Sequence, residues 1–393
     1  MRAAQLKAVL PRELLASVVV FLVALPLCMG IAIASGLPPA KGLITGIIGG
    51  LVVGWLAGSP LQVSGPAAGL AVLVFELVRQ HGIAMLGPIL LLAGFLQLVA
   101  GRLKLGCWFR VTAPAVVYGM LAGIGVLIVL SQVHVMLDAV PKPSGLDNLA
   151  AFPAAVAQAL PSFGWQAGIL GLATIAVMYL WEKFRPHSLR FVPGALLGVG
   201  LATVASLVLA LQVKRVEVPA NLAEAIDWLK PADLLNLADP TVLIAAFAVA
   251  FIASAETLLS AAAVDRMHSG QRSDFDRELS AQGVGNMLCG LLGALPMTGV
   301  IVRSSANVQA GATTRFSAIF HGLWLLAFVL LLSSVLQSIP VASLAGVLVY
   351  TGFKLVDLKA FRGLGRYGRM PMFTYAATAL AIIFTDLLTG VLI

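Results

Sequence analysis

Two ionisable residues stand inside long apolar stretches of this sequence, where a charge is costly. Glu256 lies in AFIASAETLLSAA, and Arg303 lies in PMTGVIVRSSANVQAG, followed by Ser304, Ser305 and Asn307. A charge at the centre of a bilayer costs about 3 kcal/mol on insertion scales, so such residues normally face a partner or a cavity. Side chains of these types could bind one ion and couple it to another. A structural Glu–Arg pair is the alternative.

Arg303 and Ser304 lie in the short segment that follows a turn at Thr298–Gly299. A similar turn at Ser64–Gly65–Pro66 precedes another short apolar segment. A helix that begins at such a turn offers free backbone N–H groups and the positive end of its dipole. Arg303 adds a permanent positive charge with forked donors, and Ser304 adds a hydroxyl. This combination favours an anion, and we expect Arg303 to border a wet cavity.

Glu256 would repel a nearby anion unless it is protonated, paired or bound to a cation. Uptake of a proton or Na⁺ together with the anion would remove this repulsion, so Glu256 is a candidate for coupling. We expect the proton, because few oxygen ligands besides Thr257 and Ser260 lie near Glu256 in the sequence. Gln62 and Thr298 are weaker candidates for residues that line the cavity.

The elements that carry these residues are predicted to be membrane spans. Of 393 residues, 60% are hydrophobic and 11% are charged, whereas soluble domains carry about 25% charged residues. Apolar stretches close to the length that crosses a bilayer recur along the chain, which predicts an all-α polytopic membrane protein. We expect long spans at 14–35, 41–58, 84–101, 112–134, 166–182, 191–212, 241–263, 280–294, 315–337, 341–356 and 371–393, and short segments at 64–78 and 299–311.

Counting the short segments, and dividing the last region at Asp386, gives fourteen elements. If both termini are cytoplasmic, eighteen of the twenty-five Lys and Arg residues lie inside and six outside, with Arg303 in the membrane. The polar stretches 138–165 and 214–240 then face outside, the latter with short amphipathic helices. The two short segments occupy matching positions of two halves, which indicates an inverted-repeat transporter with its substrate site between them.

Other features argue against further classes of protein. Cys28, Cys107 and Cys289 are far apart in or beside apolar segments, so we interpret them as core residues rather than disulfide or metal ligands. No basic run with interleaved aromatics suggests nucleic acid binding. No paired Asp, H-E-x-x-H or nucleophile–base arrangement suggests an enzyme. Glycines at every fourth position from Gly42 to Gly58 predict close helix packing.

Three stretches carry a resemblance to a known family. They are LPLCMGIAIASGLPPAKGLITGIIGG (25–50), SGPAAGL (64–70) and ETLLSAAAVDRMHSGQRSDFDRELSAQGVGNMLCGLLGALPMTGVIVRSSAN (256–307). The first resembles the first-span signature of the SulP anion permeases, solute carrier family 26, and the second resembles the half-helix of that family. The third is similar to its long and highly specific block. The resemblance spans nearly the whole chain.

This resemblance implies fourteen segments in two inverted seven-segment repeats, with half-helices 3 and 10 meeting at the substrate site. A core domain (about 14–110 and 241–337) would move against a gate domain (about 111–215 and 341–393). Many members have Gln in place of Leu27 and an aromatic in place of Ile31, so we expect a less polar, roomier pocket. The pocket residues that the resemblance implies are Leu27, Ile31, Gly65, Pro66, Ala67, Glu256, Val302, Arg303 and Ser304.

The expected function is secondary-active transport of a small anion (the sulfate, bicarbonate and dicarboxylate class) by elevator-like alternating access. We expect proton coupling, no cofactor and a location in the cell (inner) membrane. An anion channel and a nucleobase–cation symporter of the same fold are alternatives. Saturable flux that depends on a pH gradient would exclude the channel, and Arg303 argues against a neutral base.

Family members usually continue after the last span into a cytosolic sulfate-transporter/anti-sigma-antagonist domain. The sequence up to Ile393 contains no such domain. We therefore expect the chain to be the membrane part of a longer protein. The resemblance implies that the full-length homodimer relies partly on the cytosolic domain. We expect this chain to be monomeric in detergent.

Overall fold

The structure, a computed structural model, describes residues 3–106, 114–142, 144–186, 189, 192–219 and 222–385. Within these residues, 7 helices are long and apolar enough to cross a membrane. The first half of the chain contains α1 (Ala3–Ala34), α2 (Pro39–Ile48), the π-helix η1 (Gly49–Val53), α3 (Gly54–Leu56), β1 (Ser64–Pro66), η2 (Ala68–Leu70), α4 (Ala71–His81), η3 (Ile83–Met85), α5 (Leu86–Arg102), α6 (Pro114–Met136), α7 (Gly145–Ala159), α8 (Gly164–Phe184) and α9 (Gly194–Val208).

The second half begins with two short 3₁₀ helices and then repeats the order of long helices. It contains η6 (Leu222–Ala225), η7 (Pro231–Ala238), α10 (Pro240–Met267), α11 (Phe275–Leu291), β2 (Met297–Gly299), α12 (Ile301–Gln309), α13 (Phe316–Leu331), α14 (Ser333–Gln337), α15 (Val341–Leu355), α16 (Leu358–Leu364), η8 (Gly365–Tyr367) and α17 (Arg369–Phe384).

The two halves are related as inverted repeats. The succession α1, α2–α3, β1–α4, α5, α6 and α8 corresponds to α10, α11, β2–α12, α13, α15 and α17. β1 and β2 pair antiparallel, with Gly65 opposite Thr298, so the two half-helices leave the pairing in opposite directions. The predicted all-α membrane fold is confirmed, with this short strand pair added. The end of the last predicted span, including Asp386, lies outside the described residues.

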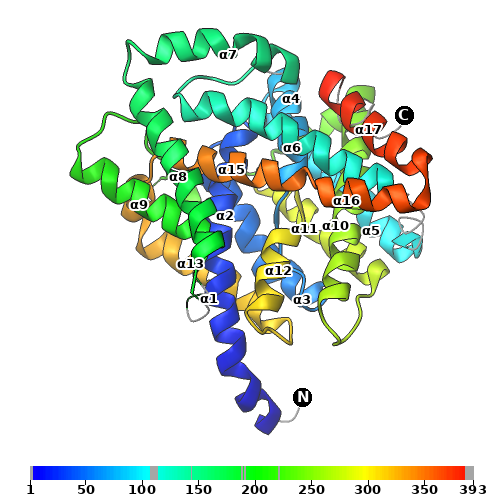
Figure 1. Ribbon diagram of the computed structural model, residues 1–393. Helices are drawn as coiled ribbons and strands as arrows, with labels where there is room; N and C mark the ends of the chain where they lie inside the picture. Colours follow the sequence, from blue (N-terminus) through cyan, green and yellow to red (C-terminus); the bar gives the residue numbers. More distant parts are fainter. Residues whose placement is uncertain are drawn as a thin grey trace.

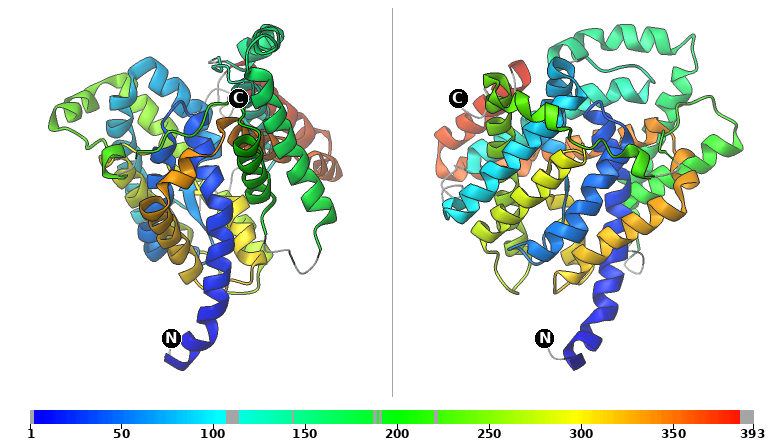
Figure 2. Two further views of the ribbon diagram at one scale, coloured as in Figure 1. Left: turned by 90° about the vertical axis from the view of Figure 1, so that its left-hand side faces the viewer. Right: turned by 180° about the vertical axis from the view of Figure 1, so that it is seen from behind.

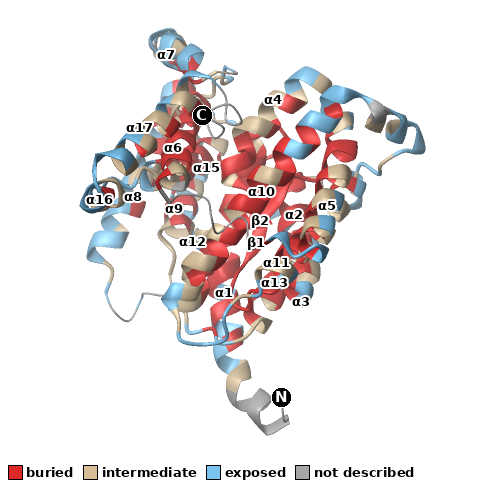
Figure 3. Ribbon diagram, turned by 90° about the vertical axis from the view of Figure 1, so that its right-hand side faces the viewer, coloured by how far each residue is buried: buried red, intermediate tan, exposed pale blue. Residues whose placement is uncertain are grey.

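The long helices form two groups that lie side by side (Figures 1 and 2). The first group packs around the strand pair and contains α1, α2, α4, α5 and α10 to α13, and the second contains α6, α8, α9, α15 and α17. Helices α1 and α4 of the first group contact the second group, α1 through α6, α9 and α15, and α4 through α6. Buried residues are concentrated in α1, α2, α10 and the two strands (Figure 3).

Helix α7, within the stretch 138–165, was not predicted from the sequence. It lies at the end of the molecule opposite the start of α1 (Figure 1). The Ser144 hydroxyl caps it by accepting the backbone N–H of Asp147 at 3.0 Å. Helices η6 and η7 fall in the stretch 214–240, where short helices were predicted, and their presence confirms that prediction.

The predicted glycine stripe lies on α2, η1 and α3, except for Gly58 just beyond α3, and brings other helices close. A methyl group at Gly42 would collide with the backbone of Cys28 on α1, and one at Gly50 would collide with that of Gly322 on α13. The prediction of close helix packing is therefore confirmed. This packing holds α1 and α13 beside the strand pair.

Candidate functional site

The site is built around the pairing of two extended segments, residues 63–67 and 296–300, which we call the crossing. Beyond the paired strands, the Val300 N–H donates to the Val63 carbonyl at 2.9 Å, and the Ala67 N–H donates to the Pro296 carbonyl at 3.3 Å. Helix α12 begins directly after β2, and η2 and α4 begin directly after β1. Since the first N–H groups of a helix lack partners within it, two positive helix ends meet at this crossing. The crossing thus provides the paired half-helices that the sequence predicted.

Arg303, the third residue of α12, is fully enclosed, with 0% of its surface exposed. Its guanidinium lies against Gly65, where an added methyl group would collide with Nη1. Cys28 on α1 and His321 on α13 are also close. The Cys28 thiol lies within hydrogen-bonding reach of the guanidinium, and no oxygen atom accepts from its three nitrogens among the described residues. The guanidinium fills the space that the missing side chain of Gly65 leaves at β1 and is enclosed there. The expectation that Arg303 borders a wet cavity is therefore wrong.

The neighbours of Arg303 in α12 differ in exposure. Val302 is 40% exposed, whereas Ser304 is fully buried. The Ser304 hydroxyl accepts the Val63 N–H at 2.9 Å and donates to the Val300 carbonyl at 2.7 Å. Ser304 thus joins the start of α12 to the segment before β1. Both bonding directions of its hydroxyl are used within the protein.

Glu256 lies in α10, beside the half-helix that begins at η2, opposite the half-helix that carries Arg303. Its carboxylate accepts the backbone N–H of Gly69, and a methyl group at Gly69 would lie 2.9 Å from Oε2. The Oε2 atom itself has no hydrogen-bond partner in the part of the chain that the structure describes. Because no oxygen atom accepts from the nitrogens of Arg303 there either, the alternative of a Glu256–Arg303 pair is excluded. A carboxylate therefore occupies the helix end after β1, and a separate, uncompensated cation stands beside β1.

The remaining predicted pocket residues come together in the same region. Leu27 and Ile31 on α1 and Ala67 after β1 are 5%, 2% and 2% exposed and belong to one buried cluster. Gly65 and Pro66 form β1 and are buried as well. Helix α1 packs on both β1 and α12, which places its apolar side chains at the crossing.

Several buried polar atoms around the crossing lack a nitrogen or oxygen partner among the described residues. Buried polar groups are nearly always hydrogen-bonded, so such a concentration of exceptions is typical of a functional site rather than of an ordinary core. The atoms are Gln62 Oε1, Gln282 Oε1, Glu256 Oε2, Thr298 Oγ1 and the three nitrogens of Arg303. Oriented N–H groups and a guanidinium suit a small anion, which the carboxylate of Glu256 would repel.

A polar stripe on α11 that the sequence analysis missed holds the crossing in place. Glu278, Gln282 and Asn286 follow one another at intervals of four and are all fully buried. Gln282 Nε2 donates to the Ser64 hydroxyl at 2.6 Å. Asn286 accepts the Met297 N–H at 2.8 Å and donates to its carbonyl at 3.1 Å. Three polar residues on one face of an apolar span are the signal that could have identified this stripe.

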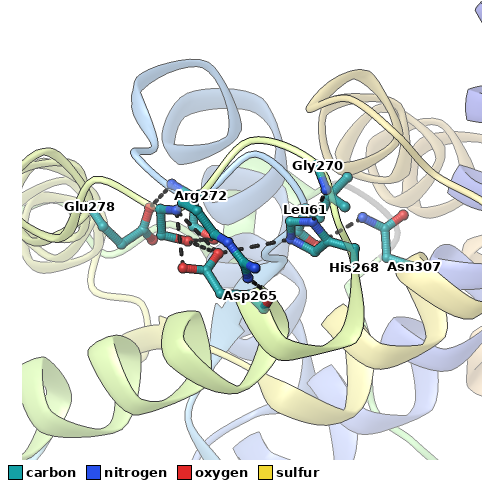
Figure 4. Close-up of polar contacts among 9 residues, drawn as sticks. Leu61, Asp265, His268, Gly270, Arg272, Glu278 and Asn307 are labelled. Atoms are coloured by element: carbon teal, nitrogen blue, oxygen red, sulfur yellow. Dashed lines mark hydrogen bonds and ion pairs between the residues drawn. The ribbon is translucent and has the colours of Figure 1, made fainter.

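The stripe continues to the loop between α10 and α11 (Figure 4). Glu278 Oε2 accepts the Ser59 N–H at 2.9 Å, and the Ser59 and Ser273 hydroxyls lie 2.8 Å apart. The Ser273 hydroxyl also donates to Asp265 at 2.8 Å, and His268 Nε2 lies 3.9 Å from the same carboxylate. These bonds tie the loop to the segment that leads into β1.

Comparison with known proteins agrees with this architecture. The chain is 30% identical to "Putative sulfate transporter YvdB" of Bacillus subtilis (strain 168), over 97% of this chain and 71% of that protein. It is 27% identical to the bicarbonate transporter BicA of Synechocystis sp. (strain ATCC 27184 / PCC 6803 / Kazusa), over 89% of this chain and 63% of that protein.

The fold is similar to that of a solved relative. The transmembrane domain of a cyanobacterium bicarbonate transporter BicA superposes with a TM-score of 0.84, at 26% identity and over 97% of both chains. Residues 10–378 match the family described as the Sulfate permease family. The match covers the strand pair, both half-helices and all the site residues considered above, and the chain therefore belongs to the sulfate permease family.

Proposed function

The sulfate permease family transports anions, and we propose that this chain is a secondary-active transporter of a small anion. The observation that carries the proposal is the unneutralised guanidinium of Arg303 beside two helix ends. A permanent positive charge without a protein acceptor attracts an anion to the crossing. Since Arg303 is enclosed, it acts through its field, while the backbone N–H groups of the half-helices would contact the anion directly.

The substrate class is inferred from the site and from the named relatives. Relatives carry names that refer to sulfate and to bicarbonate, and a single fixed cation suits compact oxyanions of this kind. Small dicarboxylates belong to the same class. The side chains of Leu27 and Ile31 on α1 are apolar and donate no hydrogen bonds to a substrate. This favours a substrate that is bound mainly by the two half-helices.

Coupling is assigned to Glu256. Its ionised carboxylate competes with an incoming anion for the N–H of Gly69 and repels it. Protonation would remove the charge, so that anion and proton enter together and leave together. Na⁺ bound beside Glu256 would have the same electrostatic effect. We favour the proton.

The movement that we propose is elevator-like. The core domain (about 14–110 and 241–337) contains the crossing and all site residues, and the gate domain (about 111–215 and 341–393) contains α6, α8, α9, α15 and α17. Helices of each group pack mainly on one another, which supports their movement as two bodies. Displacement of the core along the gate would carry the anion across without opening a continuous pore.

We further propose that the chain lies in the cell (inner) membrane with both termini in the cytoplasm. The excess of Lys and Arg in the segments assigned to that side supports this orientation.

The experiment is uptake by proteoliposomes that contain the purified chain. Radiolabelled sulfate, bicarbonate and fumarate are tested separately under imposed pH and Na⁺ gradients. We expect saturable uptake of at least one of them, stimulated by acid outside. Flux that never saturates and follows the membrane potential would instead favour an anion channel. Uptake of a neutral nucleobase, but of no anion, would favour a nucleobase–cation symporter.

A further inference from the structure

Two connections between the helix groups are hydrogen-bonded to each other. Segment 209–239 joins α9 to α10, and segment 332–340 joins α13 to α15. The two meet as an antiparallel bridge in which Arg215 lies opposite Pro340. Lys214 Nζ donates to the carbonyl of Asp138 at 2.6 Å, in the turn between α6 and α7. The pairing therefore lies at the α7 end of the molecule.

Backbone hydrogen bonds flank the bridge on both sides. The Val216 N–H donates to the Ile339 carbonyl at 2.9 Å, and the Val341 N–H donates to the Lys214 carbonyl at 2.9 Å. In this pattern, Pro340 occupies a position whose N–H would point away from the partner segment. A proline fits there without loss of a hydrogen bond.

Side chains from both segments reinforce the pairing. Arg215 Nη1 donates to the Ser338 carbonyl at 2.7 Å. From the other segment, Gln337 Nε2 donates to the Val218 carbonyl at 2.8 Å. Each connection thus binds the backbone of the other, and residues 214–218 and 337–341, which we call the paired linkers, form one element.

The paired linkers are also part of the hydrophobic core. Val216 and Val218 are 2% and 4% exposed, and Ile339 is 7% exposed. All three belong to the same cluster as the buried residues of α1 and α2. Separating the two segments would expose these side chains and leave buried backbone groups without partners.

Further contacts fix segment 209–239 to both helix groups. On one side, the Gln212 N–H donates to Gln166 on α8 at 2.8 Å. On the other side, Asp227 forms an ion pair with the buried Lys41 of α2 at 2.6 Å, and the Leu229 N–H donates to the Leu291 carbonyl at the end of α11 at 3.0 Å. The segment therefore reaches from one group to the other with the paired linkers between its two attachments.

We propose that the paired linkers stay intact during transport and act together as one hinge between the helix groups, which the chain also joins between α5 and α6. This inference rests on the proposed elevator-like movement. Two independent connections would let the groups twist freely, whereas a joined pair restricts their relative movement. Bending then occurs at the ends of the pair rather than by its opening.

The test is a disulfide across the bridge. Cα atoms in such a non-hydrogen-bonded antiparallel pair lie about 4.5 Å apart, within the range of about 4.4–6.8 Å that a disulfide requires. The variant Arg215→Cys/Pro340→Cys is made with Cys107→Ser, while the native Cys28 and Cys289 are buried. We expect the oxidised protein to keep its uptake rate within about twofold of the reduced protein, since a hinge that remains closed loses nothing. Each single-cysteine variant, oxidised in the same way, is the control.

A strong loss of uptake on oxidation, reversed by a reductant, would overturn the proposal because it would show that the pair must open. A second cross-link separates this outcome from failure of the elevator-like movement. Val72 on α4 and Leu127 on α6 line one small cavity between the groups. Joining Val72→Cys to Leu127→Cys with a short bifunctional thiol reagent should stop uptake. Unchanged uptake after this cross-link would contradict the proposed movement itself.

A milder variant covers the case in which the double cysteine protein does not fold. Gln337→Ala removes one side-chain bond across the pair and leaves the crossing untouched. We expect the pair to open about fivefold more often, because one hydrogen bond typically contributes about 1 kcal/mol to stability, and the maximum uptake rate to fall while KM stays unchanged. Ser334→Ala, an exposed position in the same segment, is the matched control. A wild-type maximum rate in Gln337→Ala would contradict the role of the pair.

Discussion

The guanidinium of Arg303 lies against the Cα atom of Gly65, so that a single methyl group at position 65 would collide with Nη1. This contact joins the two halves of the molecule, since Gly65 belongs to β1 and Arg303 to α12. A glycine is required here for space, because its backbone lies in an extended strand. The position of the charge in the second repeat therefore depends on the absence of a side chain in the first.

The variant Gly65→Ala should displace Arg303 and reduce anion uptake about tenfold or more, because a shift of about 1 Å in a site can cost two orders of magnitude in rate. Gly200→Ala on α9 is the matched control, since nothing lies within 4 Å of an added methyl group there. Both proteins are compared by uptake per inserted molecule. Equal uptake by Gly65→Ala and the wild type would show that this contact does not set the position of the charge.

The variant Glu256→Gln mimics the protonated carboxyl permanently. We expect it to bind and exchange the anion but to lose accumulation driven by a pH gradient, because no proton can then move with the substrate. Wild-type uptake should rise when the outside is acidic. If Na⁺ is the coupling ion, the variant should instead lose stimulation by Na⁺.

The measurement is uptake against a concentration gradient and, separately, exchange at equal concentrations. Glu224→Gln, an exposed carboxyl in η6 outside the paired linkers, is the control. Undiminished accumulation by Glu256→Gln in response to a pH gradient would remove Glu256 from the coupling mechanism.

The variant Asn286→Leu tests the polar stripe on α11. It leaves the N–H and carbonyl of Met297 without partners in the core, and each unsatisfied group costs about 1–3 kcal/mol. We expect a clear drop in the unfolding temperature of the protein in detergent. Ser280→Ala on the same helix, whose hydroxyl donates to the Asp276 carbonyl within the helix, should change it little. Equal unfolding temperatures would show that Asn286 does not hold β2.

Much of the fold was predictable because bilayer spans and their interruptions leave strong signals in a single sequence. The runs at Ser64–Gly65–Pro66 and Thr298–Gly299 marked the half-helices, and Arg303 and Glu256 were identified from their apolar surroundings. The strand pair itself was not predicted, because three residues on each side carry no periodicity. Its partners are more than 200 positions apart in the chain.

The arrangement within the site was less accessible. The sequence placed Arg303 beside a cavity, whereas packing against a glycine of the other repeat encloses it fully. It offered Ser304 as a free hydroxyl, which the structure uses to join two backbone segments. Both differences arise from contacts between the repeats, which no local pattern encodes. The polar stripe on α11 could have been predicted from the sequence, because residues four positions apart lie on one face of a helix.

The most direct test of the central claim is the concentration dependence of anion uptake by Arg303→Ala in proteoliposomes. At an effective dielectric constant of about 20, two opposite unit charges about 6–11 Å apart attract each other by about 1.5–3 kcal/mol, and loss of this attraction corresponds to about a 10- to 150-fold increase in KM. Arg303→Lys should recover part of this loss, because it restores the charge but not the packing of the planar guanidinium against Gly65. Arg366→Ala, an exposed cation in η8, should behave like the wild type. We predict a large rise in KM for Arg303→Ala in protein that is folded and inserted, and a wild-type KM would contradict the anion site proposed at the crossing.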